Sequence, residues 1–186
     1  MRSSYLHHAL KIALLMLISH GCIEPRAAIA RYRLEGVDDA EGTLVEIKER
    51  RRAFLIVVRS SVIDADESGA SIVKEALKTD ARDARRHFYP YNVIARKLNE
   101  YMRKHHSMSA VDEAWQADYI IYFNLVQYRR TINGVYPYGE LYVILNRGAD
   151  AAAKPARIIW KTKKILWAED AVKEFLSELK RTRGER

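Results

Sequence analysis

Cysteine, proline and glycine are scarce in this chain of 186 residues. The single cysteine, Cys22, excludes an intramolecular disulfide and a zinc site built on cysteines. Four prolines and eight glycines are too few for a collagen-like or low-complexity chain. The longest apolar run, residues 12–18, is far shorter than the roughly 20 residues of a membrane-spanning helix. These absences favour one soluble domain that is stabilised by its hydrophobic core.

Charge is plentiful, and the basic sign is in excess. Apolar residues make up 48% and charged residues 30% of the chain, which is typical of a globular protein, and the net charge is +8. Removal of residues 1–22 would delete Arg2 and Lys11 and no acid, so the charge would fall by two to +6. Because 24 acidic residues are interspersed with 32 basic ones, no nucleic-acid partner is expected.

The first 22 residues are interpreted as a signal sequence. A polar start precedes the apolar run, whose length suits the core of a signal peptide. The run is followed by Gly21-Cys22, which resembles the lipidation site of bacterial lipoproteins, and Glu24 resembles their pattern for outer-membrane sorting. Cys22 is therefore the expected lipidation site. Two alternatives stay open: cleavage after Ala30, and an uncleaved helix with Cys22 as a buried thiol.

The rest of the chain is interpreted as a tether or edge segment (23–52), one α/β domain (53–181) and a basic tail (182–186). Period and turn signals predict strands at 53–62, 117–128, 138–145 and 157–163, a possible edge strand at 43–47, and helices at 70–87, 91–102 and 168–181. Pro90 should separate the first two helices, and Asn133-Gly134 should form a hairpin turn. The order β-α-α-β-β-β-α predicts an α+β two-layer sandwich: a mixed sheet of four to five strands with helices on one face.

Three pieces of this pattern carry a resemblance to a known group of proteins. They are Ala117-Asp118-Tyr119 at the start of a strand, Ile158-Ile159-Trp160, and the helix at 168–180. Together they look like the periplasmic lipoprotein domains of the curli-secretion and penicillin-binding-protein-activator types. The resemblance implies an assembly or interaction module of the periplasm rather than a catalyst. Independently of it, the strand pattern around Trp160 predicts a core residue.

Residues that could carry chemistry do not form a convincing site in the sequence. Asp64, Asp66, Ser68, Gly69 and Glu75 match the spacing of a calcium loop, but the preceding segment is predicted as a strand, so helix capping explains them better. His105-His106 are adjacent and cannot share a metal as an i, i+4 pair does. No catalytic residue, metal ligand or cofactor is expected.

A tyrosine-rich strand face is the predicted partner-binding surface. Alternation places Tyr122, Tyr128 and Tyr142 opposite the wholly apolar face, with Tyr136 and Tyr138 near the hairpin and Arg129 and Arg130 at the rim. A half-exposed sheet that merely accommodates tyrosines is the competing interpretation.

The sequence thus predicts a non-enzymatic lipoprotein of the cell envelope, facing the periplasm. Its expected partner is an envelope protein or an anionic cell-wall or lipid polymer, with the N-terminal lipid in the membrane. An envelope hydrolase, or a nucleic-acid-binding protein if the signal sequence is false, stays open.

Overall fold

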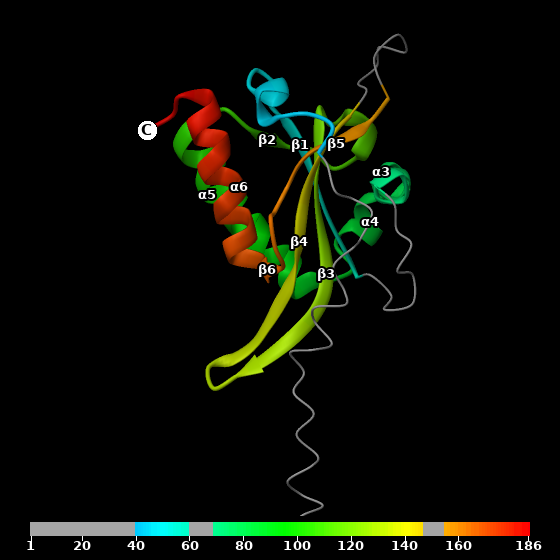
Figure 1. Cartoon of the computed structure of the whole chain (residues 1–186), viewed down its shortest axis with the longest axis vertical. Helices are drawn as coiled ribbons and strands as arrows, with labels where there is room; N and C mark the ends of the chain where they lie inside the picture. Colours follow the sequence, from blue (N-terminus) through cyan, green and yellow to red (C-terminus); the bar gives the residue numbers. More distant parts are fainter. Residues whose placement is uncertain (1–39, 60–68, 147–154) are drawn as a thin grey trace, which may run out of the picture. The chain divides into compact units, whose positions relative to one another are not determined.

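The structure, a computed structural model, describes residues 40–59, 69–146 and 155–186 and is built on one mixed β-sheet (Figure 1). The strands are β1 (Arg52–Arg59), β2 (Ser109–Ala110), β3 (Tyr119–Thr131), β4 (Gly134–Leu145), β5 (Arg157–Lys161) and β6 (Leu166–Trp167). Their spatial order is β2-β1-β3-β4-β5, and β6 pairs with β4 outside this row. β1 runs parallel to β2 and β3, whereas β4 runs antiparallel to β3, β5 and β6.

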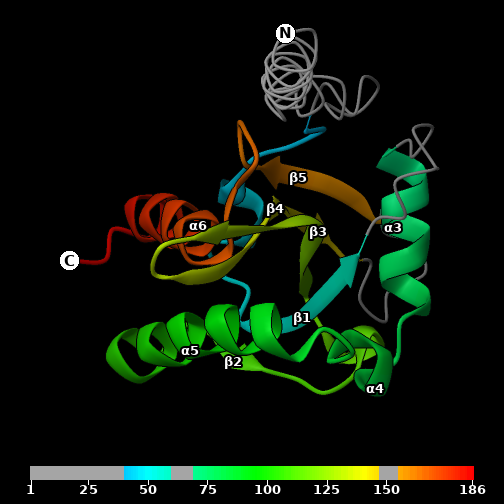
Figure 2. The same ribbon diagram turned by 90° about the horizontal axis from the view of Figure 1, so that it is seen from below.

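Helical elements lie on both faces of the sheet (Figure 2). They are η2 (Leu44–Ile47), α3 (Gly69–Lys78), α4 (Ala81–Ala84), α5 (Phe88–His105), η3 (Ala114–Gln116) and α6 (Ala168–Arg183). The larger core packs α5 and α6 against one face and includes Phe123 of β3 and Phe175 of α6. The smaller core packs α3 and α4 against the other face and includes Ile72 of α3 and Ile56 of β1.

The predicted α+β class and mixed sheet are confirmed. In detail the helices differ from the prediction of one covered face, because α3 and α4 form a second, smaller layer. The helix expected at 70–87 is two helices, since the side chain of Asp80 accepts hydrogen bonds from the backbone N–H groups of Arg82 and Asp83 and so starts α4. Pro90 does not end a helix; it lies in the first turn of α5, where its missing N–H costs nothing.

The second half of the domain follows its predicted pattern closely. β3 and β4 pair as an antiparallel hairpin with Tyr122 opposite Tyr142. The two residues between the strands are Ile132 and Asn133, so the turn lies one position before the predicted Asn133-Gly134. Trp160 is buried as predicted: its ring contacts that of Phe175 at 5.6 Å between centroids, and its Nε1 donates to Glu178 at 2.7 Å. The apolar stripe of α6 is buried along its whole length.

Both predicted flanks of the domain are wrong in the part the structure describes. Residues 43–47 form the 3₁₀ helix η2 instead of a strand, and Leu44 and Ile47 are buried, so the segment from residue 40 onward is part of the core rather than a tether. The supposed basic tail is also packed. The guanidinium of Arg183, at the end of α6, donates to the carbonyl oxygens of Ile47, Lys48, Arg50 and Ser107. Cation-to-carbonyl bonds of this kind tie the two ends of the domain together.

None of the helices among the described residues has the length and apolarity needed to cross a bilayer. Cys22 and the acidic residues Asp64, Asp66 and Glu67 lie outside the described residues.

Candidate partner-binding arm

The outer halves of β3 and β4 extend past the neighbouring strand as a two-stranded arm, residues 126–138 (Figure 1). The pairing of β1 with β3 ends at Arg59 opposite Leu125, whereas β3 and β4 stay paired as far as Thr131 opposite Gly134. A two-residue turn connects the strands at the tip of the arm. Gly134 has φ 136°, a conformation open to glycine, and the hydroxyl of Thr131 accepts from the N–H of Asn133 at 3.2 Å.

An irregularity separates the arm from the rest of the sheet. The register of β3 against β4 shifts between Leu125 and Gln127, which leaves Val126 as an extra residue. Gly139 lies opposite Leu125, and a Cβ atom added there would come within 2.0 Å of the carbonyl oxygen of Asn124. Such bulges bend a strand and increase its twist. Glycine is therefore required where the two strands approach most closely, at the base of the arm.

Tyr122 and Tyr142, the two inner tyrosines of the predicted binding face, are buried and not available to a partner. Each is 1% exposed, and their rings meet edge to face with 6.2 Å between centroids. Their hydroxyls donate to Glu75 of α3 at 2.7 Å and to Glu140 at 2.8 Å. The prediction that these two tyrosines form a partner surface is wrong, because α3 covers this part of the sheet.

The three outer tyrosines and the two arginines lie on the arm. Tyr128 is 42% exposed, Tyr136 and Tyr138 are half-buried, and Arg130 is exposed. The structure adds Trp167 of β6, which the sequence pattern does not predict as part of this surface. Its ring stacks on Tyr136 at 4.8 Å and meets Tyr138 edge to face at 5.7 Å, while the guanidinium of Arg129 lies 4.4 Å from the centre of the Tyr138 ring on the same arm.

Trp167 could not have been found from its sequence neighbours. It comes just before a helix, in a strand of only two residues, and it reaches the arm through pairing with Tyr138. Its indole N–H is buried and has no hydrogen-bond partner among the described residues.

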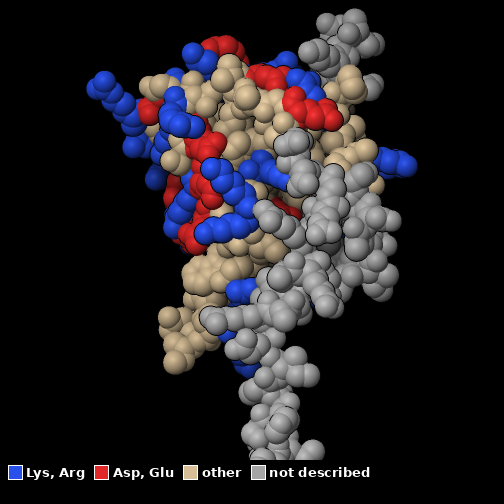
Figure 3. Space-filling view, viewed as in Figure 1, with Lys and Arg blue, Asp and Glu red and all other residues tan. Residues whose placement is uncertain are grey.

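The tip of the arm is apolar and exposed. Ile132 is 101% exposed and Val135 is 47% exposed. In the space-filling view the projecting tip is free of charged atoms, with basic atoms just above it (Figure 3). The chain has no Asp or Glu between residues 126 and 139, so no acidic residue of the arm itself balances the charges of Arg129 and Arg130.

More positive charge lies near the base of the arm. Burial raises the pKa of Tyr128, Arg59 acts to lower it and Tyr89 to raise it, and the net shift is upward. Burial, Arg59 and Arg86 together lower the pKa of His87. Arg59 therefore affects the pKa values of both Tyr128 and His87. Because Arg59 pairs opposite Leu125, the base of the arm carries positive charge, as the arm itself does.

A small cavity lies between the arm and the first turn of α6. Tyr136, Pro137 and Trp167 line it together with Val93 of α5 and Lys173 of α6, and its volume is about 170 Å³. Sites for small molecules usually measure roughly 300 to 1,000 Å³. This cavity therefore suits one inserted side chain better than a substrate or cofactor.

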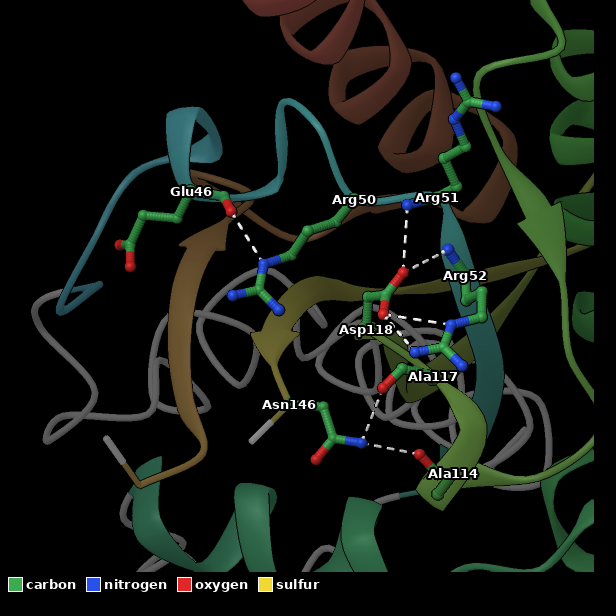
Figure 4. A network of polar contacts seen from close by, with 8 residues as sticks. All are labelled: Glu46, Arg50, Arg51, Arg52, Ala114, Ala117, Asp118 and Asn146. Atoms are coloured by element: carbon green, nitrogen blue, oxygen red, sulfur yellow. Dashed lines mark hydrogen bonds and ion pairs between the residues drawn. The ribbon is translucent and has the colours of Figure 1, made fainter. Parts of the chain in front are cut away.

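The Asp118 cluster, part of the pattern that suggested the lipoprotein resemblance, holds the starts of β1 and β3 together (Figure 4). Oδ2 of Asp118 accepts from the backbone N–H groups of Arg51 and Arg52 at 3.1 and 2.8 Å, and Oδ1 accepts from the Arg52 guanidinium at 2.8 Å. Burial raises the pKa of Asp118, but these hydrogen bonds outweigh burial and hold the pKa below its ordinary value. These contacts join the start of β3 to the start of β1 and so stabilise the pairing of the two strands.

Other candidates from the sequence are dispersed. His105 ends α5, and His106 caps it with a left-handed φ of 54°, as expected for a helix end. The calcium pattern lies largely outside the described residues, and its last member, Glu75, accepts from Tyr122. Within residues 40–59, 69–146 and 155–186, no group of three or more His, Cys, Asp or Glu side chains could hold a metal ion.

No protein-family model, no curated protein and no solved structure matches this chain. The resemblance to periplasmic lipoprotein domains stays a prediction.

Proposed function

We propose that this chain is a non-enzymatic binding module of the bacterial cell envelope, and that the arm contacts its partner. The module would face the periplasm, anchored by a lipid on Cys22 at the outer membrane. The partner class is an envelope protein or an anionic cell-wall or lipid polymer. The short apolar run before Gly21-Cys22, with Glu24 after it, supports the anchor.

The observation that carries the binding role is the exposure of apolar and aromatic side chains on an arm that the core does not need. Ile132, Val135 and Tyr128 are all more than 40% exposed. A two-stranded ribbon alone is marginally stable in water, and exposed apolar groups cluster at interaction sites. The aromatic contacts with Trp167 support the base of the ribbon and leave its tip free for a partner.

Shortening the arm tests this proposal directly. Residues 128–137 are replaced by Asn-Gly, which joins the paired residues Gln127 and Tyr138 through a two-residue hairpin turn. The domain should keep its fold because both hydrophobic cores lie outside the deleted segment. A photo-crosslinking residue at Val135 in the wild-type chain should give an adduct in envelope preparations, whereas one at Val45, also exposed, should not.

The shortened variant supplies the decisive comparison. A crosslinker at Leu77, on the surface that both chains share, should give the same result with the full arm and with the shortened arm. The Cys22→Ser change is introduced into both chains to remove the anchor, and the fraction of each chain that stays with the envelope is measured. If the shortened variant is retained as well as the chain with the full arm, the arm is not the binding surface.

The anchor needs its own test. Growth with radiolabelled palmitate should label the wild-type chain and not the Cys22→Ser variant, and fractionation should move the variant out of the membrane. A mature chain that begins at Arg31 in mass spectrometry would contradict lipidation.

A further inference from the structure

We infer that the tip of the arm inserts into the interfacial region of an anionic lipid bilayer. The inference rests on the proposed binding role of the arm and narrows its partner from several classes to one, a lipid surface. It concerns the arm itself and is independent of whether Cys22 carries a lipid.

The arm carries an apolar residue at its tip and basic and aromatic side chains on the pairs that follow: Ile132 lies in the turn, then come the pair Arg130–Val135 and the pair Arg129–Tyr136. The outermost apolar residues are Ile132, which is fully exposed, and Val135, which is 47% exposed. Arg130 lies opposite Val135, and Arg129 lies opposite Tyr136 one pair further from the tip. A bilayer presents hydrocarbon, then an interfacial zone favoured by aromatic rings, then charged headgroups. Long arginine side chains reach back to the headgroups while their stems stay in apolar surroundings.

The charge of the arm selects an anionic surface. Two arginines and no carboxylate occupy residues 126–139, and Arg59, paired opposite Leu125, adds a positive charge at the base of the arm. Each basic residue near an anionic membrane strengthens binding about fivefold, and this attraction is weakened by salt. A zwitterionic surface offers no such attraction.

The geometry of the arm fits the other envelope partners less well. An acidic glycan would stack on open aromatic faces, but Tyr136 and Tyr138 already use their rings against Trp167 and Arg129. A protein partner usually buries about 800 Å² per side around a packed core. The tip offers a narrow convex end in which the fully exposed residue is an isoleucine, which suits insertion into a deformable surface.

A fluorescent reporter at the tip tests the inference. The full chain carries Cys22→Ser, so that an Ile132→Cys substitution supplies its only thiol for a polarity-sensitive dye. The matched control is Val45→Cys, another exposed apolar position, 65% exposed and located in η2. Vesicles of equal parts phosphatidylglycerol and phosphatidylcholine should shift the emission of the dye at position 132 to the blue, and lipid-borne quenchers should reduce it. Neither effect is expected at position 45 or with pure phosphatidylcholine.

Charge and apolar contributions are then separated by affinity, measured by vesicle sedimentation on the Cys22→Ser background. Ile132→Asp should weaken binding to the anionic vesicles about tenfold or more, because an inserted isoleucine is lost. Arg130→Gln should weaken it about fivefold. The matched controls Val45→Asp and Arg103→Gln, both at exposed positions away from the arm, should bind as the parent does. Circular dichroism and thermal unfolding confirm that each variant is folded.

Failure of this inference is distinguishable from failure of the proposed function. Insertion is overturned if the emission of the dye at position 132 does not shift although the chain sediments with vesicles. It is also overturned if Ile132→Asp and its parent bind the anionic vesicles with equal affinity. If the Val135 crosslinker still gives an arm-dependent adduct with an envelope protein or polymer, the proposed binding role stands and the partner is not lipid. If shortening the arm changes neither the binding to anionic vesicles nor the formation of the crosslinked adduct, both proposals are wrong.

Discussion

The tyrosines of β3 and β4 divide into two regions that differ in role although they share residue type, sheet and hairpin. At the inner region, Tyr122 and Tyr142 are 1% exposed and hydrogen-bonded beneath α3. At the outer region, Tyr128 is 42% exposed on the arm. What differs is the cover: α3 reaches the inner pair and does not reach the outer residues. The role of an aromatic row is therefore set by the neighbouring layer.

The largest effect in this comparison is expected from Tyr122→Ala. Loss of the buried ring and of its hydrogen bond to Glu75 should lower the free energy of unfolding by about 3 to 5 kcal/mol. The matched change on the arm, Tyr128→Ala, should alter it by only about 0.5 kcal/mol. Chemical denaturation followed by far-UV circular dichroism measures both. Similar losses at the two positions would remove the distinction between the regions.

The boundary between the regions is tested by Gly139→Ala. The added Cβ would lie 2.0 Å from the Asn124 carbonyl oxygen and 2.7 Å from Cζ of Phe123, so the backbone must move, and we expect a loss of about 3 kcal/mol. Gly184→Ala is the control: it has a left-handed φ of 69° and open space around it, so the loss should be about 1 kcal/mol. Equal losses in thermal unfolding would mean that close approach at the bulge is unimportant.

A third prediction contrasts the arm with the opposite end of the sheet, where a carboxylate holds the strands together. Because the pKa of Asp118 is lower in the folded chain than its ordinary value of 3.8, the ionised form stabilises the fold above that value. This stability should be lost as the pH falls from about 3.8 through the folded pKa.

Removal of the charge checks the sign. Asp118→Asn should cost about 2 kcal/mol at neutral pH, because the hydrogen bonds from Arg51 and Arg52 lose a charged acceptor. Its stability should then depend less on pH in the acid range than that of the wild type. Denaturation midpoints measured between neutral and acid pH decide this, and parallel curves for the two chains would refute the assignment.

The smallest effect is expected at the tip. Ile132→Ser should change the free energy of unfolding by no more than about 0.5 kcal/mol, because the side chain is fully exposed. Its binding to anionic vesicles should nevertheless fall. Calorimetry and vesicle sedimentation on the same preparation test the two halves of this statement, and a destabilised variant would place Ile132 in the fold rather than at a binding surface.

Several features follow from local pattern and were predicted from the sequence alone. Alternation along the inner parts of β3 and β4, a tight hairpin within one residue of Asn133-Gly134, the stripe of α6 and the burial of Trp160 depend on short-range periodicity and turn chemistry, which a sequence displays directly. Tyr136 and Tyr138 were predicted near the hairpin. Alternation placed Tyr128 on the face of Tyr122, and the bulge at Val126 changes that placement.

Capping and packing over long distances were not visible in the pattern. Asp80 starts a new helix inside one continuous apolar stripe, and Leu44 and Ile47 are drawn into the core from a segment that is polar in composition. The side chain of Arg183 reaches carbonyl groups more than a hundred positions away in the chain. Such contacts depend on where two elements meet in space.

The sequence by itself determined which residues share a strand face in the inner part of the sheet, because side chains alternate with a period of two. Beyond the bulge at Val126 the alternation of β3 changes, which the sequence did not show. The sequence also did not determine what lies over each face. Only the tertiary structure placed α3 over Tyr122 and Tyr142, brought Trp167 beneath Tyr136, and left Ile132 uncovered at the end of the arm. Cover comes from elements distant in the chain, and their positions follow from the packing of the whole domain rather than from any local period.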